Sequence, residues 1–246
     1  MKLYTELAEY YFDIEKSGRK FDEEIYFLDD LFKKHKIRSV IDMGCGTGEH
    51  VKALQSRGYE IVGIDSSDKM VNVAKKRFPH CKFDIGFMQG YQASHHYDGI
   101  VFLFGTFNYL ITDEEIKSAL KLLQQNLKPS GLAIFEIWNA EPIRKIKRKP
   151  ITNVATLKSG QIQIKRHRGF RLTRSDQATV VDVNYVYNLD ARELKDKHTM
   201  RVFFWNEIKA KLEDFKFEIL NVYGNYKMDK FKSNGGRILI VAKKKA

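Results

Sequence analysis

The sequence predicts an α/β fold in which helices cover both faces of a doubly wound parallel sheet, with a small antiparallel β insertion. Short β-rich segments alternate with helical segments up to residue 138, and this alternation requires crossover connections between parallel strands. After that residue the pattern changes, and residues 153–204 keep the two-residue period of strands without intervening helices. A length of 246 residues suits one such sheet plus an insertion.

The main fold is expected to begin with an amphipathic helix over residues 21–32, whose apolar residues fall at helical spacing with acidic residues on the other face. A β-rich segment at 38–43 follows and ends at Gly44. The remaining predicted elements are helix 49–57, strand 60–65, helix 68–77, strands 81–85 and 98–104, helix 112–127 and strand 132–138, then helix 206–214 and strands 216–223 and 236–243.

The insertion is expected to be a small antiparallel sheet with a hairpin turn at residues 158–161. We therefore divide the chain into a main domain, residues 1–139 and 199–246, and a basic β insertion, residues 140–198, that forms part of the acceptor site. The residues expected to share one face of one strand are Val181, Val183, Tyr185, Tyr187 and Leu189.

Positive charge is concentrated in the insertion. Residues 143–174 contain six arginines, five lysines and no acidic residue, and so carry +11 of the formal net charge of +12. An anionic partner would therefore meet this segment rather than the whole protein. A solvated basic hairpin that only favours solubility is the alternative.

The composition excludes a disulfide miniprotein and a disordered chain. The first residues include several acids and no long apolar segment, so neither a signal nor a transit peptide is expected, and no membrane partner. Cys45 and Cys81 have no ligands at zinc spacing, which favours a cytoplasmic protein without a structural metal.

The strongest motif is the segment DMGCGTG at residues 42–48, a strand that runs into Gly44, Gly46 and Gly48 before a helix. Such glycines let the backbone turn sharply and let a ligand approach closely. In a dinucleotide site the third glycine normally follows the second by three residues, whereas here it follows by two. Asp42 would repel a pyrophosphate and attract an ammonium group.

The next strand ends in Asp65, 17 positions past Gly48, where a carboxylate can accept hydrogen bonds from both ribose hydroxyls. Taken alone, Asp65 would more often be a helix cap. A carboxylate for an ammonium group, a glycine loop against a nucleoside and an acid on the ribose together describe a site for S-adenosylmethionine.

With these motifs the sequence resembles the class I S-adenosylmethionine-dependent methyltransferases. Residues 42–48, 61–70 and 97–110 resemble the family's first, second and fourth motifs, and residues 127–136 resemble its turn and fifth strand. The resemblance implies a Rossmann-like, seven-stranded sheet whose last strand, residues 237–242, is antiparallel.

Within the family the sequence is most similar to small-molecule N-methyltransferases, especially the dimethyltransferases of nucleotide-linked amino sugars. The shared features are GTGEH at 46–50, NYL at 108–110, FEIW at 135–138, the β insertion and an Asp-x-His at 196–198. This similarity implies transfer of the methyl group of S-adenosylmethionine, leaving S-adenosylhomocysteine, to a small acceptor, an amine such as that of a nucleotide-linked amino sugar. The basic insertion predicts that this acceptor is anionic.

The resemblance implies that the glycine loop surrounds the methionine part of the cofactor, that Asp65 holds the ribose, that Met70 packs beside the adenine, and that Tyr10 or Tyr11 reaches the cofactor carboxylate. Cys45 is expected to be a small packing residue in the loop. The full set of expected cofactor-binding residues is Tyr10, Tyr11, Asp42, Gly44, Cys45, Gly46, Gly48, Asp65, Ser66, Met70, Phe87, Met88 and Phe104.

The sequence departs from the family after the third strand. The family usually has Gly-Asp-Met there, with the Asp reading the adenine amino group, and this chain has Gly86, Phe87 and Met88. Either the adenine is held by backbone groups and by stacking on Phe87, or cofactor binding is weakened and the protein is a degenerate member.

The acceptor is expected beyond the fourth and fifth strands, because ligands of open parallel sheets bind at the carboxyl ends of strands. His198 is the expected base, since a histidine titrates in the useful range and its position matches the family pattern; a histidine satisfied by the backbone is the alternative. Tyr109 and Trp138 are the other expected catalytic residues. The residues expected near the acceptor are Phe104, Thr106, Asn108, Tyr109, Trp138 and Asn139.

Two other functions stay open at this point. The first is an RNA methyltransferase in which the basic insertion follows a phosphate backbone. The second, suggested by Phe87, is a cofactor-binding protein without catalysis. A monomer and a weak dimer are equally compatible with the sequence.

Overall fold

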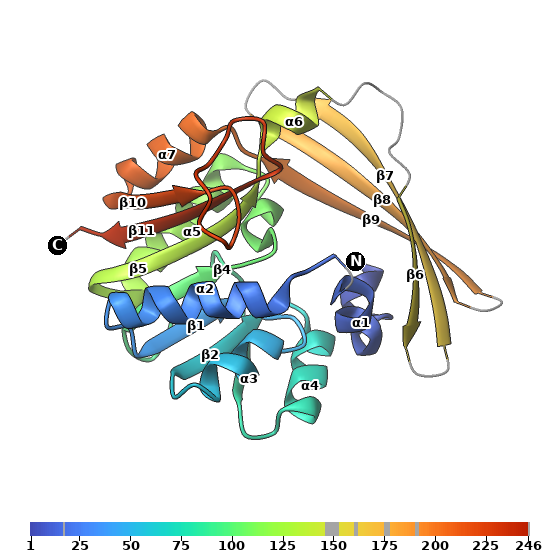
Figure 1. The fold of residues 1–246 in the computed structure, drawn as a ribbon, viewed down its shortest axis with the longest axis horizontal. Helices are drawn as coiled ribbons and strands as arrows, with labels where there is room; N and C mark the ends of the chain where they lie inside the picture. Colours follow the sequence, from blue (N-terminus) through green and yellow to red (C-terminus); the bar gives the residue numbers. More distant parts are fainter. Residues whose placement is uncertain (17, 146–152, 160–161, 175–177, 190–191, 246) are drawn as a thin grey trace.

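The computed structural model describes residues 1–16, 18–145, 153–159, 162–174, 178–189 and 192–245, which contain a seven-stranded sheet and a four-stranded sheet (Figure 1). The order of the large sheet is β10-β11-β5-β4-β1-β2-β3, and β11 runs antiparallel to both of its neighbours. This confirms the seven-stranded sheet with an antiparallel last strand. Its strands are β1 (Ser39–Met43), β2 (Glu60–Asp65), β3 (Lys82–Ile85), β4 (Tyr97–Phe102), β5 (Leu127–Trp138), β10 (Phe217–Tyr223) and β11 (Arg237–Lys244).

Helices cover both faces of the large sheet, as expected for a doubly wound fold. One apolar cluster joins the sheet to α2, α3 and α4, and a second cluster joins its other face to α5 and α7. None of the helices among the described residues is long and apolar enough to cross a membrane. These helices are α2 (Phe21–Lys34), α3 (Glu49–Gln55), α4 (Asp68–Arg77), α5 (Asp113–Asn126) and α7 (Trp205–Asp214).

The small sheet follows the short helix α6 (Ala140–Arg144) and has the strand order β6-β7-β8-β9, with every pair antiparallel. The predicted face of β8 is confirmed, because its residues from Val181 to Tyr187 alternate between buried and more exposed positions. The strand β9 continues past residue 198, where we ended the insertion, so that boundary stays a prediction. The four strands are β6 (Asn153–Ser159), β7 (Ile162–Arg174), β8 (Thr179–Leu189) and β9 (Arg192–Val202).

Two predictions fall partly outside the described residues. The hairpin turn at 158–161 includes residues 160–161, and the basic segment at 143–174 includes residues 146–152. The charge argument below therefore uses only basic residues with described side chains.

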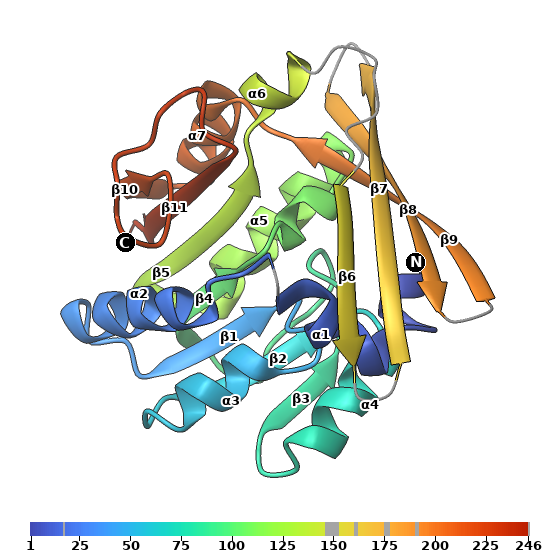
Figure 2. The same ribbon diagram turned by 45° about the vertical axis from the view of Figure 1, so that its right-hand side comes forward.

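The N-terminal segment forms three short helices that the sequence pattern did not predict: η1 (Lys2–Tyr4), η2 (Ala8–Tyr10) and α1 (Tyr11–Lys16). Their apolar residues, among them Leu3 and Ile14, share a buried cluster with the inner face of the small sheet. A buried ion pair between Arg166 of β7 and Glu15 of α1 adds a second tie. The N-terminal segment thus lies between the small sheet and the carboxyl ends of the main strands (Figure 2).

Candidate active site at the carboxyl ends of the strands

The glycine loop turns tightly between β1 and α3, as its sequence predicted. Gly44, Gly46 and Gly48 all have positive φ angles, of 80°, 55° and 86°, which side chains other than glycine rarely adopt. A Cβ atom on Gly44 would lie 2.3 Å from the Thr106 side chain. The N–H of Gly44 donates to the Ile64 carbonyl at 2.7 Å, which fixes the loop against β2.

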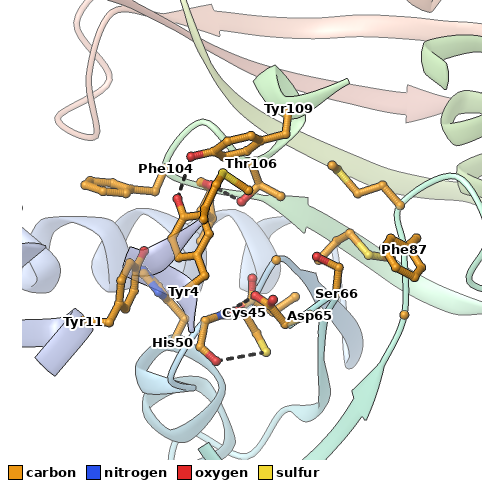
Figure 3. A pocket seen from close by; sticks show the side chains of 18 of the residues that line it. Tyr4, Tyr11, Cys45, His50, Asp65, Ser66, Phe87, Phe104, Thr106 and Tyr109 are labelled. Carbon is orange, nitrogen blue, oxygen red and sulfur yellow. Dashed lines mark hydrogen bonds between the residues drawn. The ribbon is translucent and has the colours of Figure 1, made fainter. Parts of the chain in front are cut away.

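A cavity of about 230 Å³ opens above this loop, at the carboxyl ends of β1, β2 and β4 (Figure 3). It brings together most of the residues predicted from the sequence. The predicted residues that line it are Tyr11, Asp42, Gly44, Cys45, Gly46, Asp65, Ser66, Phe87, Met88, Phe104, Thr106 and Tyr109.

Asp42 places a carboxylate at the floor of the cavity. The residue is 2% exposed, and its Oδ2 atom has no hydrogen-bond partner among the described residues. Burial raises the pKa of Asp42 to about 6, although the nearby His50 and Arg19 oppose this rise. A buried carboxylate oxygen without a partner is costly, and a ligand ammonium group would satisfy it.

Asp65 occupies the rim of the cavity at the end of β2. Its Oδ2 accepts the N–H of Gly46 and its Oδ1 accepts the N–H of Ser67, each at 2.9 Å. Burial raises the pKa of Asp65, and these backbone donors oppose the rise. A carboxylate offers about four lone-pair positions. Since the backbone N–H groups of Gly46, Ser66 and Ser67 use three of them, Asp65 retains an acceptor position for a ribose hydroxyl.

A cationic residue that the sequence analysis missed also lines the cavity. Arg19 donates to Glu24 at 2.6 Å, and its guanidinium lies 4.2 Å from the centre of the Phe104 ring. His50, in the GTGEH segment, contacts Glu24 at 2.9 Å and lines the cavity beside it. Arg19 lies outside the quoted motifs, so only its place in the fold reveals it.

Phe104 has a left-handed backbone conformation that a hydrogen bond to Glu136 stabilises. Its φ angle is 54°, in the left-handed region. Its N–H donates to the buried Glu136 at 2.7 Å, and Tyr226 and Arg237 contact the same carboxylate. This support positions the Phe104 ring at the cavity and under the Arg19 guanidinium.

The end of the cavity near β3 is apolar. The Phe87 side chain is 59% exposed, and Met88 lies next to it in the lining. The N–H of Gly86 donates to the backbone carbonyl of Asp65 at 3.0 Å, which places this turn beside Asp65. An exposed aromatic ring at this position is suited to stacking on a flat base.

The opposite end of the cavity carries two phenols. Tyr4 of η1 and Tyr109 of η3 (Thr106–Tyr109) both line it, and their hydroxyl oxygens lie 2.7 Å apart (Figure 3). Tyr4 was not singled out from the sequence, because no motif marks the N-terminal turn. Tyr109 was predicted, and the structure places it at the cavity.

Five of the residues predicted to bind the cofactor or to act in catalysis do not line the cavity. Gly48 begins α3, where a Cβ atom would lie 2.6 Å from Phe83, so its role is in the packing of the loop. Met70 is buried against Ala8 of the N-terminal segment. Tyr10 and Trp138 pack against the apolar cluster under the small sheet. His198 is buried.

His198 is 1% exposed and reaches the cavity only through another side chain. Its Nδ1 lies 2.7 Å from the Tyr109 hydroxyl, and its Nε2 lies 3.0 Å from Asp196. Trp138 packs against Phe170 with ring centres 6.3 Å apart. Neither His198 nor Trp138 therefore lines the cavity in which an acceptor would bind.

Two asparagines expected near the acceptor are structural. Asn108 is fully buried, donates to the Arg201 carbonyl at 2.6 Å and accepts the N–H of Trp138. Asn139 caps α6 and donates to the carbonyls of Ser233 and Gly235. Across the described residues, no group of three or more His, Cys, Asp or Glu side chains is arranged to hold a metal ion.

Comparison with known proteins shows what this fold and loop resemble. A methyltransferase-domain family model matches residues 40–131, which contain the glycine loop and Asp65. The chain is 27% identical over 123 residues to dTDP-3-amino-3,4,6-trideoxy-alpha-D-glucopyranose N,N-dimethyltransferase of Streptomyces venezuelae, covering 49% of this chain and 52% of the relative. It is 26% identical to dTDP-3-amino-3,6-dideoxy-alpha-D-glucopyranose N,N-dimethyltransferase of Streptomyces fradiae, covering 54% and 53%. The matches thus span about half the length of these curated relatives.

Solved structures share the fold over nearly the whole chain. An S-adenosylmethionine-dependent methyltransferase from Clostridium acetobutylicum superposes with a TM-score of 0.82 at 17% identity and 99% coverage of both chains. The S-adenosylmethionine-bound amino pentose methyltransferase CalS10 from Micromonospora echinaspora superposes with a TM-score of 0.72 at 22% identity and 93% coverage of both. Residues 40–131 therefore match a methyltransferase domain, and the chain is similar to S-adenosylmethionine-dependent methyltransferases, amino-sugar N-methyltransferases among them.

Proposed function

We propose that the protein transfers the methyl group of S-adenosylmethionine to an amine of a small, anionic acceptor. The observation that carries the proposal is the Asp42 carboxylate, which lines a glycine-loop cavity rimmed by Asp65 and whose buried Oδ2 lacks a partner among the described residues. A methionine-type ammonium group would satisfy the first carboxylate, and a ribose hydroxyl would satisfy the second.

The remaining lining fits the rest of the cofactor. The Arg19 guanidinium can pair with the methionine carboxylate, because only part of its five-donor fork is used by Glu24. Phe87 and Met88 offer an apolar surface to the adenine. When bound, S-adenosylmethionine supplies an electrophilic methyl group, so the protein has mainly to align the acceptor, exclude water and accept a proton.

An amine acceptor is supported by the relatives and by the phenols. The curated relatives are named for N,N-dimethylation of dTDP-linked amino sugars. In this chain, Tyr4 and Tyr109 place hydroxyl oxygens at the end of the cavity away from Phe87, where they can hydrogen-bond an amine.

The anionic character of the acceptor rests on the inner face of the small sheet. Arg166 on this face is already paired with Glu15. Arg168 lies two residues further along β7, hydrogen-bonds Tyr185, and keeps a buried Nε with no partner in the described part of the chain. Because arginine binds phosphate oxygens well, Arg168 is the residue that we propose contacts the phosphate of a nucleotide-linked acceptor.

The test compares acceptors by the S-adenosylhomocysteine that they release. We expect turnover with a dTDP-linked amino sugar, a higher KM for Arg168→Ala than for Lys165→Ala, whose side chain is exposed on the other face of β7, and a shallow salt dependence. Methylation of RNA with a steep loss of affinity in salt would instead support the nucleic-acid alternative. Cofactor binding without turnover on any acceptor would support a protein without catalysis.

A further inference from the structure

A chain of three hydrogen bonds leads from the cavity to a buried carboxylate. The Tyr4 hydroxyl lies 2.7 Å from the Tyr109 hydroxyl, which lies 2.7 Å from Nδ1 of His198. Nε2 of His198 lies 3.0 Å from Oδ2 of Asp196. Tyr4 and Tyr109 line the cavity, whereas the His198 and Asp196 side chains are only 2% and 5% exposed.

The Asp196 carboxylate, at the buried end, determines which atom donates in each hydrogen bond of this series. Burial alone would raise the pKa of Asp196, but hydrogen bonds from His198 and from the backbone N–H groups of Leu3 and Lys2 hold it well below its ordinary value. An ionised carboxylate only accepts hydrogen bonds, so Nε2 of His198 carries the hydrogen and Nδ1 accepts from Tyr109. Tyr109 in turn accepts from Tyr4, which leaves lone-pair capacity on the Tyr4 oxygen at the cavity.

The two phenols are suited to passing a proton on rather than holding a charge. Burial raises the pKa of Tyr4 and of Tyr109 well above the ordinary value, so both are neutral near pH 7. A neutral hydroxyl can accept one proton while it donates another. The His198 ring is fixed between the rings of Tyr4 and Tyr185, with centres 5.2 and 4.9 Å away.

We propose that Tyr4 accepts a proton from the ammonium group of the acceptor, and that successive proton transfers through Tyr109 leave the extra proton on His198. The inference rests on the proposed function, because it needs an amine acceptor in this cavity. One N–H bond of the acceptor ammonium breaks as an O–H bond forms on Tyr4. The Tyr4 proton moves to Tyr109, and the Tyr109 proton moves to Nδ1 of His198. The imidazolium is stabilised by Asp196, and the nitrogen lone pair that remains is the nucleophile.

The same contacts give the N-terminal turn a role in assembling the site. The N–H of Leu3 donates at 2.8 Å to Oδ2 of Asp196, the oxygen that His198 also contacts. The packing of η1 against β9 therefore both orients His198 and places the adjacent Tyr4 in the cavity. An ion pair between Glu6 and Arg192, at 2.6 Å, adds to this docking.

Other titratable groups face this chain and enter its pH dependence. Negatively charged groups near the cavity oppose the loss of a proton by the acceptor ammonium, and positively charged groups favour it. Tyr11 and Glu15 on α1 and Tyr185 on β8 act on Tyr4 or Tyr109, and Arg166 and Arg168 on β7 act on Tyr185.

The experiment measures kcat as a function of pH for the wild type, Tyr4→Phe and His198→Gln, with a dTDP-linked amino sugar as acceptor. Phenylalanine keeps the Tyr4 ring packing and removes only the hydroxyl. Tyr26→Phe, which alters a 68% exposed tyrosine on α2, is the matched control. The affinity of each variant for S-adenosylmethionine, measured by calorimetry, reports whether the fold and the cofactor site are intact.

At pH 7 we expect Tyr4→Phe and His198→Gln to lower kcat by roughly 100-fold, the scale of a positioned acid–base group, with unchanged cofactor affinity. The deficit should shrink as the pH rises above the pKa of the acceptor ammonium, because the amine then arrives already neutral. A deficit that does not depend on pH, or an undiminished kcat for Tyr4→Phe, would overturn the relay alone. Absence of transfer by the wild type would overturn the proposed function and the relay with it.

Discussion

Replacement of Asp42 by Asn tests the cofactor assignment at its most informative residue. The substitution keeps the shape of the side chain and removes the charge that we assign to the methionine ammonium group. Because the residue is 2% exposed and its Oδ2 has no partner among the described residues, little else should change. Asp30→Asn, on an exposed position of α2, is the matched control.

The expected loss follows from the lost charged hydrogen bond. Such bonds contribute about 1.5–3 kcal/mol, which corresponds to a dissociation constant roughly 10- to 150-fold higher. A pH dependence should accompany it. The pKa of Asp42 is raised to about 6, so its carboxylate is ionised above this pH and protonated below it. Since the proton and the ammonium group compete for the same carboxylate, wild-type affinity should be constant above about pH 7 and fall as the pH drops below 6.

Calorimetric titration with S-adenosylmethionine between pH 5 and pH 8, flanking the pKa of about 6, measures both effects. The Asp42→Asn variant should bind more weakly at the upper end of this range and lose most of the pH dependence. If the variant binds as tightly as the wild type, with the same pH profile, then the ammonium group lies elsewhere and the assignment of Asp42 is refuted.

Three further substitutions test other parts of the site. Asp65→Ala should weaken cofactor binding by about 1–3 kcal/mol in calorimetry, and unchanged affinity would place the ribose elsewhere. Gly48→Ala should lower the melting temperature, because its φ of 86° disfavours a side chain and the new Cβ would lie 2.6 Å from Phe83; a melting temperature equal to that of the wild type would contradict this packing role. If Phe87 stacks on the adenine, Phe87→Asp should leave the affinity for S-adenosylmethionine unchanged or lower it in calorimetry. A large gain in affinity would mean that the native residue has weakened the site.

The alternation of strands and helices was sufficient to predict the main fold. The sequence placed α4 at the residues where the structure has it, because its Ser67 cap and apolar spacing are local signals. The short N-terminal helices were not predicted. Their residues are buried by contact with the small sheet rather than by a periodic pattern of their own, and such tertiary contacts leave no local signal.

The cofactor side of the site was easier to predict than the acceptor side. The glycine loop and Asp65 lie at the ends of neighbouring parallel strands, so their positions follow from the motif and its context. Arg19 and Tyr4 come from segments that cross the cavity from elsewhere, and no spacing rule connects them to it. His198 was predicted as a direct base, but the structure places Tyr109 between it and the cavity.

Transfer of an isotopically labelled methyl group tests the central claim most directly. The purified protein is mixed with methyl-labelled S-adenosylmethionine and a dTDP-linked amino sugar, and mass spectrometry locates the label. We predict S-adenosylhomocysteine and a product that carries the label on its amino nitrogen. Label that stays on the cofactor across a broad panel of amines, with the cofactor demonstrably bound, would contradict the claim that this cavity transfers methyl groups to an amine.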